Sequence, residues 1–134
     1  MKHSEAMKIV ALVGRVFYSL IFIMASIGHF SHAAVVYAAN QGVPMASIFV
    51  PISGLIAFLG GLSILLGFKA KWGAWLIVIF LVPVTLMMHR FWGVADPMIS
   101  ALQKAMFLKN LSLLGAALLI AYFGSGPFSI DKKR

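Results

Sequence analysis

Residues 48–67, IFVPISGLIAFLGGLSILLG, form an apolar run without a charged side chain. A helix of this length reaches about 30 Å, which matches the hydrocarbon core of a bilayer. Three further apolar runs are long enough to cross, at about 9–28, 72–88 and 105–123. Four such runs are too few for a closed barrel, so helices must satisfy the backbone hydrogen bonds in lipid. The sequence predicts an all-α integral membrane protein, a four-transmembrane-helix bundle forming one domain over residues 1–134.

The composition indicates that lipid is the main solvent. Hydrophobic residues make up 62% of the chain, charged residues 10%, and the mean hydropathy is +1.01. Soluble domains contain about 45–50% apolar and about 25% charged residues. The net charge of +8 comes from basic residues at the edges of apolar runs, so we expect lipid and no nucleic acid as partner. The absence of cysteine excludes disulfides, CxxC redox chemistry and thiolate metal sites.

Basic residues are distributed unevenly between the two sides of the membrane. With four spans, both termini and the second loop share one side. That side holds Lys2, Lys8, Lys69, Lys71, Lys132, Lys133 and Arg134. The positive-inside rule therefore predicts that both termini are cytoplasmic (N-in/C-in). The first run resembles a signal peptide, but its spanning length and Arg15 favour a retained helix over a cleaved one.

Two local patterns concern the second span and the loop before it. Ser53, Ala57 and Gly61 are spaced four apart and form a small-residue face that allows close helix approach in lipid. Packing within the bundle is the favoured interpretation, and a homodimer seam is the alternative. In the first external loop, about 30–46, residues 42–44 indicate a turn, and the stretch before it is compatible with a short interfacial helix.

Polar residues line one face of the first span. Arg15, Ser19, Ser26 and His29 fall within an arc of about 80°, and such a stripe is expected to face the bundle interior. We expect Arg15 to form a structural ion pair with Asp131, because the tail returns to the same side. The alternatives are snorkelling of Arg15 to the headgroups and a direct role in binding substrate.

A second polar group is expected at the external ends of three helices. Its members are His29, His89, Arg90, Lys109 and Asn110. Taken together they predict an externally open, cationic, ligand-binding pocket for an anionic or carbonyl-bearing ligand. Taken singly, each is better explained as an ordinary polar helix end, and Asp96 is the one acidic residue able to reach them. Two histidines without a nearby carboxylate do not predict a metal site, and no catalytic arrangement is present.

These residues also carry a resemblance to the DoxX family of small bacterial membrane proteins, over nearly the whole chain. The most specific motifs are Phe-Leu-Lys-Asn at 107–110 and the tail Gly-Pro-Phe-Ser-Ile-Asp at 126–131. Ser-Ile-Gly-His-Phe at 26–30, Gly-Val-Pro at 42–44 and Gly-Gly at 60–61 add to it. Family members usually carry a glutamate just before the paired glycines, where this chain has Ala57, so the intramembrane acid that could balance Arg15 or Lys109 is missing.

The resemblance implies a four-helix protein of the bacterial inner (cytoplasmic) membrane. Some relatives are subunits linked to quinone reduction or to membrane complexes that handle oxidants. We therefore expect a subunit or scaffold of a quinone-linked redox system, not an enzyme on its own, with quinone as candidate cofactor, lipid as expected ligand and other membrane or periplasmic redox subunits as candidate partners. The alternative is a non-enzymatic module that binds or transports a small anionic solute or lipid.

Overall fold

The computed structural model describes residues 4–131 as five helices joined by short loops. They are α1 (Glu5–Gly28), α2 (His32–Asn40), α3 (Ala46–Leu66), α4 (Ala70–Met88) and α5 (Pro97–Phe123). Four of them, all except α2, are long and apolar enough to cross a membrane. Within residues 4–131 there is no strand. The prediction of an all-α protein with four spans is confirmed.

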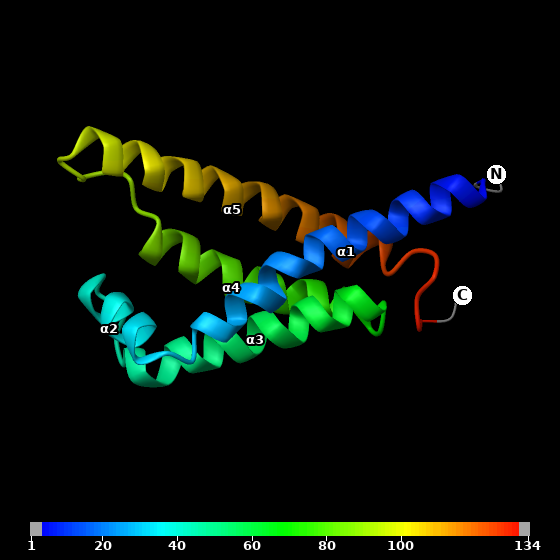
Figure 1. The fold of residues 1–134 in the computed structure, drawn as a ribbon, viewed down its shortest axis with the longest axis horizontal. Coiled ribbons are helices and arrows are strands. Elements are labelled where there is room, and N and C mark those ends of the chain that lie inside the picture. Colours follow the sequence, from blue (N-terminus) through cyan, green and yellow to red (C-terminus); the bar gives the residue numbers. More distant parts are fainter. Residues whose placement is uncertain (1–3, 132–134) are drawn as a thin grey trace.

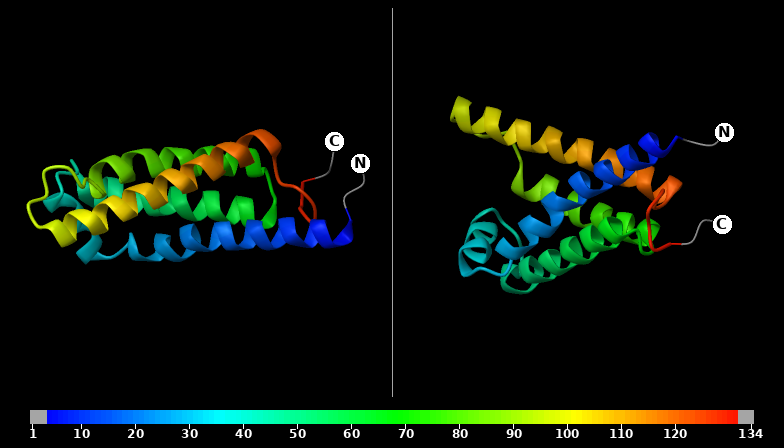
Figure 2. Two further views of the ribbon diagram at one scale, coloured as in Figure 1. Left: turned by 90° about the horizontal axis from the view of Figure 1, so that it is seen from above. Right: turned by 45° about the vertical axis from the view of Figure 1, so that its right-hand side comes forward.

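Helix α3 is the centre of the bundle. It packs against α1, α2 and α4, and α4 packs in turn against α5. The two termini lie at the same end of the molecule, as four crossings require (Figures 1 and 2). We call this the tail end, and the end that carries α2 the α2 end. That the tail end faces the cytoplasm remains a prediction, and Lys2, Lys132, Lys133 and Arg134, which contributed to it, lie outside the described residues.

Helix α5 begins well before the predicted residue 105. The Asp96 carboxylate accepts hydrogen bonds from the backbone N–H groups of Met98 and Ile99, both at 2.9 Å, and Pro97 occupies the first helical position. An acidic N-cap followed by proline is a strong start signal for a helix. Hydropathy alone missed it, because the first two turns of α5 are more polar than the rest. Asp96 is also the acid expected to reach the external polar cluster, and its carboxylate is engaged here as the cap of α5.

The short helix expected in the first external loop is present as α2. Ser31 caps it, with its hydroxyl accepting from the Ala34 N–H at 3.2 Å. The helix is largely exposed, and Ala38 is its buried residue. Ala38 packs with Ala46 and Val50 in a small apolar cluster that holds α2 against α3.

Glycines of α3 bring its backbone close to both neighbouring spans. A Cβ added at Gly60 would lie 2.8 Å from Cδ1 of Ile77 and 3.0 Å from the carbonyl oxygen of Gly73 on α4. One added at Gly61 would lie 3.1 Å from side-chain atoms of Phe22 and Ile23 on α1. Lipid tails are as apolar as side chains, so close packing of this kind is a main source of helix association in membranes. The small-residue face is thus used inside the bundle, as favoured from the sequence.

We predict that Gly60→Ala destabilises the protein while Gly115→Ala does not. The added methyl group at residue 60 meets the rigid Gly73 backbone, whereas at residue 115 it meets nothing within 4 Å. Overpacking of this kind costs about 1–3 kcal/mol, and both variants gain the same helix propensity. Thermal unfolding in detergent should show a lower Tm for Gly60→Ala alone. Equal Tm values for the two variants would contradict the close contact.

Candidate functional site

The polar face of α1 points into the protein. Arg15, Ser19, Phe22 and Ser26 are the buried residues of this helix, as the sequence predicted. Ser19 donates to the Arg15 carbonyl oxygen at 2.8 Å, and Ser26 donates to the Ile23 carbonyl oxygen at 2.6 Å. The two hydroxyls are therefore satisfied by their own helix, which leaves the guanidinium of Arg15 as the group on this face that needs distant partners.

Arg15 binds backbone carbonyl groups of the C-terminal tail. Its Nη1 donates to the carbonyl oxygens of Ser125 at 2.6 Å and Pro127 at 3.1 Å, and its Nη2 donates to that of Phe128 at 2.6 Å. The side chain is only 8% exposed. A planar guanidinium suits this arrangement because it presents several donors in a fixed fork. The tail is thereby held across the end of α1.

Asp131 is anchored next to this contact but on a different element. Its carboxylate accepts from the backbone N–H groups of Lys69 at 2.8 Å and Ala70 at 3.3 Å, and from the Ser125 hydroxyl. These N–H groups start α4, which has no side-chain cap from Lys69. The carboxylate therefore caps α4 from a distant part of the chain.

The predicted direct ion pair between Arg15 and Asp131 is not formed. The ion pair found in the described part of the chain joins Lys8 to Glu5. Arg15 and Asp131 instead act on the same tail from two sides, one through carbonyl groups and one through helix N–H groups. The physical reason is that the tail and the start of α4 both present unsatisfied backbone groups. The guanidinium binds the carbonyl groups of the tail and the carboxylate binds the N–H groups of α4, while the two charges attract each other beyond contact distance. Snorkelling to the headgroups is excluded for Arg15 by its burial.

The hydrogen bonds around Asp131 lower the pKa of its carboxyl below the ordinary value of 3.8, chiefly through the Ser125 hydroxyl and next through the Lys69 N–H. A lowered pKa in the folded state means that the ionised carboxylate stabilises the docked tail. This contribution is complete above the ordinary pKa and is lost as the pH falls through the lowered value.

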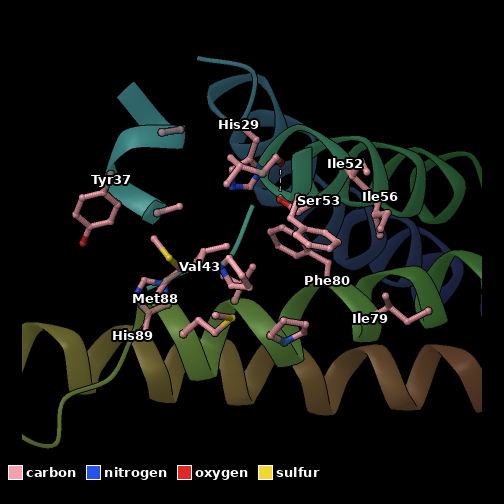
Figure 3. A pocket seen from close by; sticks show the side chains of 18 residues that line it. His29, Tyr37, Val43, Ile52, Ser53, Ile56, Ile79, Phe80, Met88 and His89 are labelled. Carbon is pink, nitrogen blue, oxygen red and sulfur yellow. Dashed lines mark hydrogen bonds between the residues drawn. The ribbon is translucent and has the colours of Figure 1, made fainter. Parts of the chain in front are cut away.

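A separate cavity of about 640 Å³ lies toward the α2 end. Its walls come from α2, α3 and α4, with the end of α1 contributing one residue. The polar lining residues are His29, Tyr37, Ser53 and His89. In Figure 3, Tyr37, His29 and His89 lie on different sides of the part of the cavity nearer α2, whereas Ile52, Ile56 and Ile79 lie toward the opposite part.

The cavity extends deep into the bundle. Ile56 lies ten residues along α3 from its start at Ala46, which corresponds to about 15 Å of helix. Ile52 is 46% exposed and Ile79 is 56% exposed, so the deep part opens on the outer surface of the spans, which faces lipid. The cavity therefore combines a polar end near the membrane surface with an apolar body open to the bilayer.

His29 lines this cavity and carries a ring nitrogen that is covered by protein atoms. Its Nδ1 is buried and has no hydrogen-bond partner among residues 4–131. The ring packs against Phe80, with centroids 5.5 Å apart, and its Cβ lies where a side chain at Gly54 would have to sit. Buried polar atoms without a partner are rare, and a bound ligand or water is the usual explanation.

His89 is oriented by a residue that the sequence interpretation did not use. Its Nδ1 lies 3.0 Å from Oε1 of Gln103 on α5. In the tautomer that satisfies the amide oxygen, Nδ1 donates this hydrogen bond and Nε2 is an acceptor. Gln103 was missed because it precedes the predicted start of the fourth span at residue 105.

The structure separates the five predicted ligand-binding residues. His29 and His89 line the cavity, whereas Arg90, Lys109 and Asn110 do not. Arg90 donates to the Gln41 carbonyl oxygen at 2.8 Å and so ties the end of α2 to the loop after α4. Lys109 is exposed and Asn110 is buried.

Lys109 and Asn110 also lie deeper than predicted. The helix rises about 9 Å between residues 103 and 109, so they lie below the level of the His89–Gln103 contact. Of the five predicted residues, the cavity thus includes the two histidines but not Arg90, Lys109 or Asn110, and it adds Tyr37 and Ser53. No cluster of three or more potential metal ligands occurs in the described residues.

Four apolar spanning helices with a short helix at one end define a small multi-pass helical membrane protein. The chain belongs to the DoxX family, whose model matches residues 10–90. It is similar to two inner membrane proteins of Escherichia coli strain K12. YqjF is 29% identical over 121 residues, covering 90% of this chain and 88% of the relative. YphA is 27% identical over 130 residues, covering 96% and 92%. No solved structure matches. The family and these relatives place the protein in the inner membrane.

We predict that replacing Arg15 with lysine loosens the tail. A single ammonium group on a shorter stem cannot reach the three carbonyl groups that the guanidinium binds. Each lost hydrogen bond to a charged group is worth about 1.5–3 kcal/mol. Thermal unfolding should show a lower Tm, and the tail should become accessible to carboxypeptidase. The control is Lys8→Arg, at a half-buried position of the same helix where arginine can keep the ion pair with Glu5. An Arg15→Lys protein as stable as wild type would contradict the clamp.

We also predict that the docked tail depends on pH through Asp131. The backbone N–H groups of Ile130 and Asp131 donate to the carbonyl oxygens of Leu66 and Gly67 at 3.1 and 2.8 Å, so their hydrogen-exchange protection reports docking. Protection should be constant above pH 3.8 and fall at lower pH as Asp131 is protonated. In Asp131→Asn it should be lower and independent of pH. Wild-type protection that does not change with acid would contradict this interpretation.

Proposed function

We propose that this DoxX family protein is a non-catalytic binding subunit that holds the head group of a membrane quinone in the cavity near α2. The observation that carries the proposal is the cavity itself, whose body is apolar and whose lining near α2 includes His29, Tyr37 and His89. Quinones have the matching shape: a ring with two carbonyl oxygens and a long apolar chain. In this proposal, electron transfer is the task of a partner protein.

The two histidines offer complementary hydrogen bonds to such a head group. A turn of the His29 ring toward the cavity would let its N–H group donate to a quinone carbonyl oxygen. His89, whose Nδ1–H is engaged by Gln103, offers Nε2 as an acceptor for a quinol hydroxyl group. The His29 donor can hydrogen-bond to an oxygen of either redox state, whereas the His89 acceptor pairs only with the hydroxyl group of the quinol. Hydrogen-bond donors aimed at a carbonyl oxygen also stabilise the negative charge that develops there during reduction.

The apolar body of the cavity favours a membrane amphiphile over a small anionic solute. Lys109 and Arg90, the cations that were expected to attract an anion, lie outside the cavity lining. Ile52, Ile56 and Ile79 provide a surface that suits a hydrocarbon chain. A lipid acyl chain would fit the same body, so binding of a phospholipid is the second candidate function. Its phosphate group would lack a cationic partner in this lining.

We predict that decylubiquinone raises the Tm of the purified protein in detergent, because a ligand that binds only the folded state stabilises it. His29→Phe keeps the ring packing on Phe80 but removes Nδ1, and the shift should fall to a small fraction of the wild-type value. Ser53→Leu, which fills the cavity, should do the same. Lys109→Ala is the matched control and should keep the full shift.

Two outcomes would contradict this proposal. One is the absence of any quinone-dependent shift in the wild-type protein. The other is a shift that Lys109→Ala abolishes and His29→Phe leaves intact, since this would place the site at the lysine. A shift produced equally by phosphatidylethanolamine and by decylubiquinone would favour the lipid-binding function.

A further inference from the structure

Helix α5 exposes a regular seam that no other part of the protein covers in the described structure. Its main packing neighbour is α4, and it is the least buried of the four spans. Ala105, Lys109, Ser112, Ala116 and Leu119 follow one another at steps of four, three, four and three residues. This spacing places them on one face of a helix, within an arc of about 80°. All are exposed except Ala116, which is half-buried.

Lys109 is the costly member of this seam. It is the thirteenth of 27 residues of α5, and it lies about 9 Å of helix below the His89–Gln103 contact. Its Nζ approaches only the sulfur of Met106 within the described residues, at 3.6 Å. A lysine within a span is rare and usually meets a partner.

The protein itself offers no acid for this lysine. The chain has three acidic residues, Glu5, Asp96 and Asp131. Each is engaged at an end of a helix: Glu5 with Lys8, Asp96 as the cap of α5 and Asp131 as the cap of α4. None of the three acidic residues lies in the spans at the depth of Lys109.

A second copy of the chain would not supply an acidic partner for Lys109 either. Two copies packed along this seam would bring Lys109 against a surface that carries no carboxylate, because all three acids lie near helix ends. Charge complementarity therefore requires a different protein. The small side chains of Ala105, Ser112 and Ala116 leave room for the backbone of a partner helix to come close.

We propose that the seam of α5 is the docking surface for a transmembrane helix of another protein, which presents an aspartate or glutamate at the depth of Lys109. The ammonium and the carboxylate satisfy each other in lipid, and the small residues on either side pack against the partner. The surface lies on α5, apart from the quinone cavity lined by α2, α3 and α4. It is therefore independent of the function proposed for that cavity.

The test uses a synthetic poly-leucine transmembrane peptide with one glutamate six residues from its outer end, and the same peptide with glutamine. Fluorescence energy transfer between labelled peptide and labelled full-length protein is measured in phosphatidylcholine vesicles. The wild type should bind the glutamate peptide several-fold more than the glutamine peptide. This preference should disappear in Lys109→Met and persist in Lys71→Met, an exposed lysine near the other end of the bundle.

Two further variants separate docking from a change in fold. Ser112→Phe adds bulk on the seam and should weaken transfer, whereas Leu111→Phe adds bulk on another exposed face and should not. A charge reversal is the most direct check: Lys109→Glu should bind a lysine-bearing peptide and reject the glutamate peptide.

Equal transfer for the glutamate and glutamine peptides in the wild type would overturn the proposal. So would a preference that survives in Lys109→Met. If Lys109→Met lowers retention of phosphatidylglycerol by the purified protein while no peptide preference exists, the lysine serves a lipid headgroup, and the proposed docking surface is wrong.

Discussion

The close approach of α3 to its neighbours is the constraint on which the rest of the structure depends. Gly61 faces α1, and Gly60 meets Gly73 of α4, both on the half of α3 nearer the tail. Since burial from water does not drive helices together within lipid, such contacts decide where helices meet and where they separate. Toward the α2 end, larger side chains such as Phe80 stand between α3 and α4, and the space beside them is the cavity. The close packing in the half nearer the tail and the cavity in the other half both follow from where small and large side chains lie along α3 and α4.

Each end of the bundle satisfies its polar groups in a different way. At the tail end, Arg15 and Asp131 are matched by backbone carbonyl and N–H groups, so the tail locks α1 to the start of α4. At the α2 end, His29 retains a buried nitrogen without a partner in the described structure. Arg15 Nε is likewise buried without a hydrogen-bond partner among residues 4–131, so an unpaired nitrogen does not by itself distinguish the two ends. The difference between them is the cavity, which His29 lines and Arg15 does not.

Much of the architecture could be predicted because it depends on properties that are local in the chain. Hydropathy located the four spans, and the spacing of Arg15, Ser19 and Ser26 identified the buried face of α1. The start of α5 was predicted poorly, although Asp96 and Pro97 carried a clear capping signal, because polar turns at a helix start weaken the hydropathy signal. For the same reason Gln103 was left out, and with it the partner of His89.

The sequence by itself determined the class of protein, the number of spans and the residues that would need a partner in lipid, since the cost of burying a charge or an unpaired nitrogen depends on the side chain alone. Only the tertiary structure decided which partners they received. Asp131 caps α4 instead of pairing with Arg15, and the cavity holds His29 and His89 but not Lys109, because the depth and rotation of each helix follow from its packing on α3 and α4. Proximity between residues far apart in the chain is a property of that packing, which no single segment specifies.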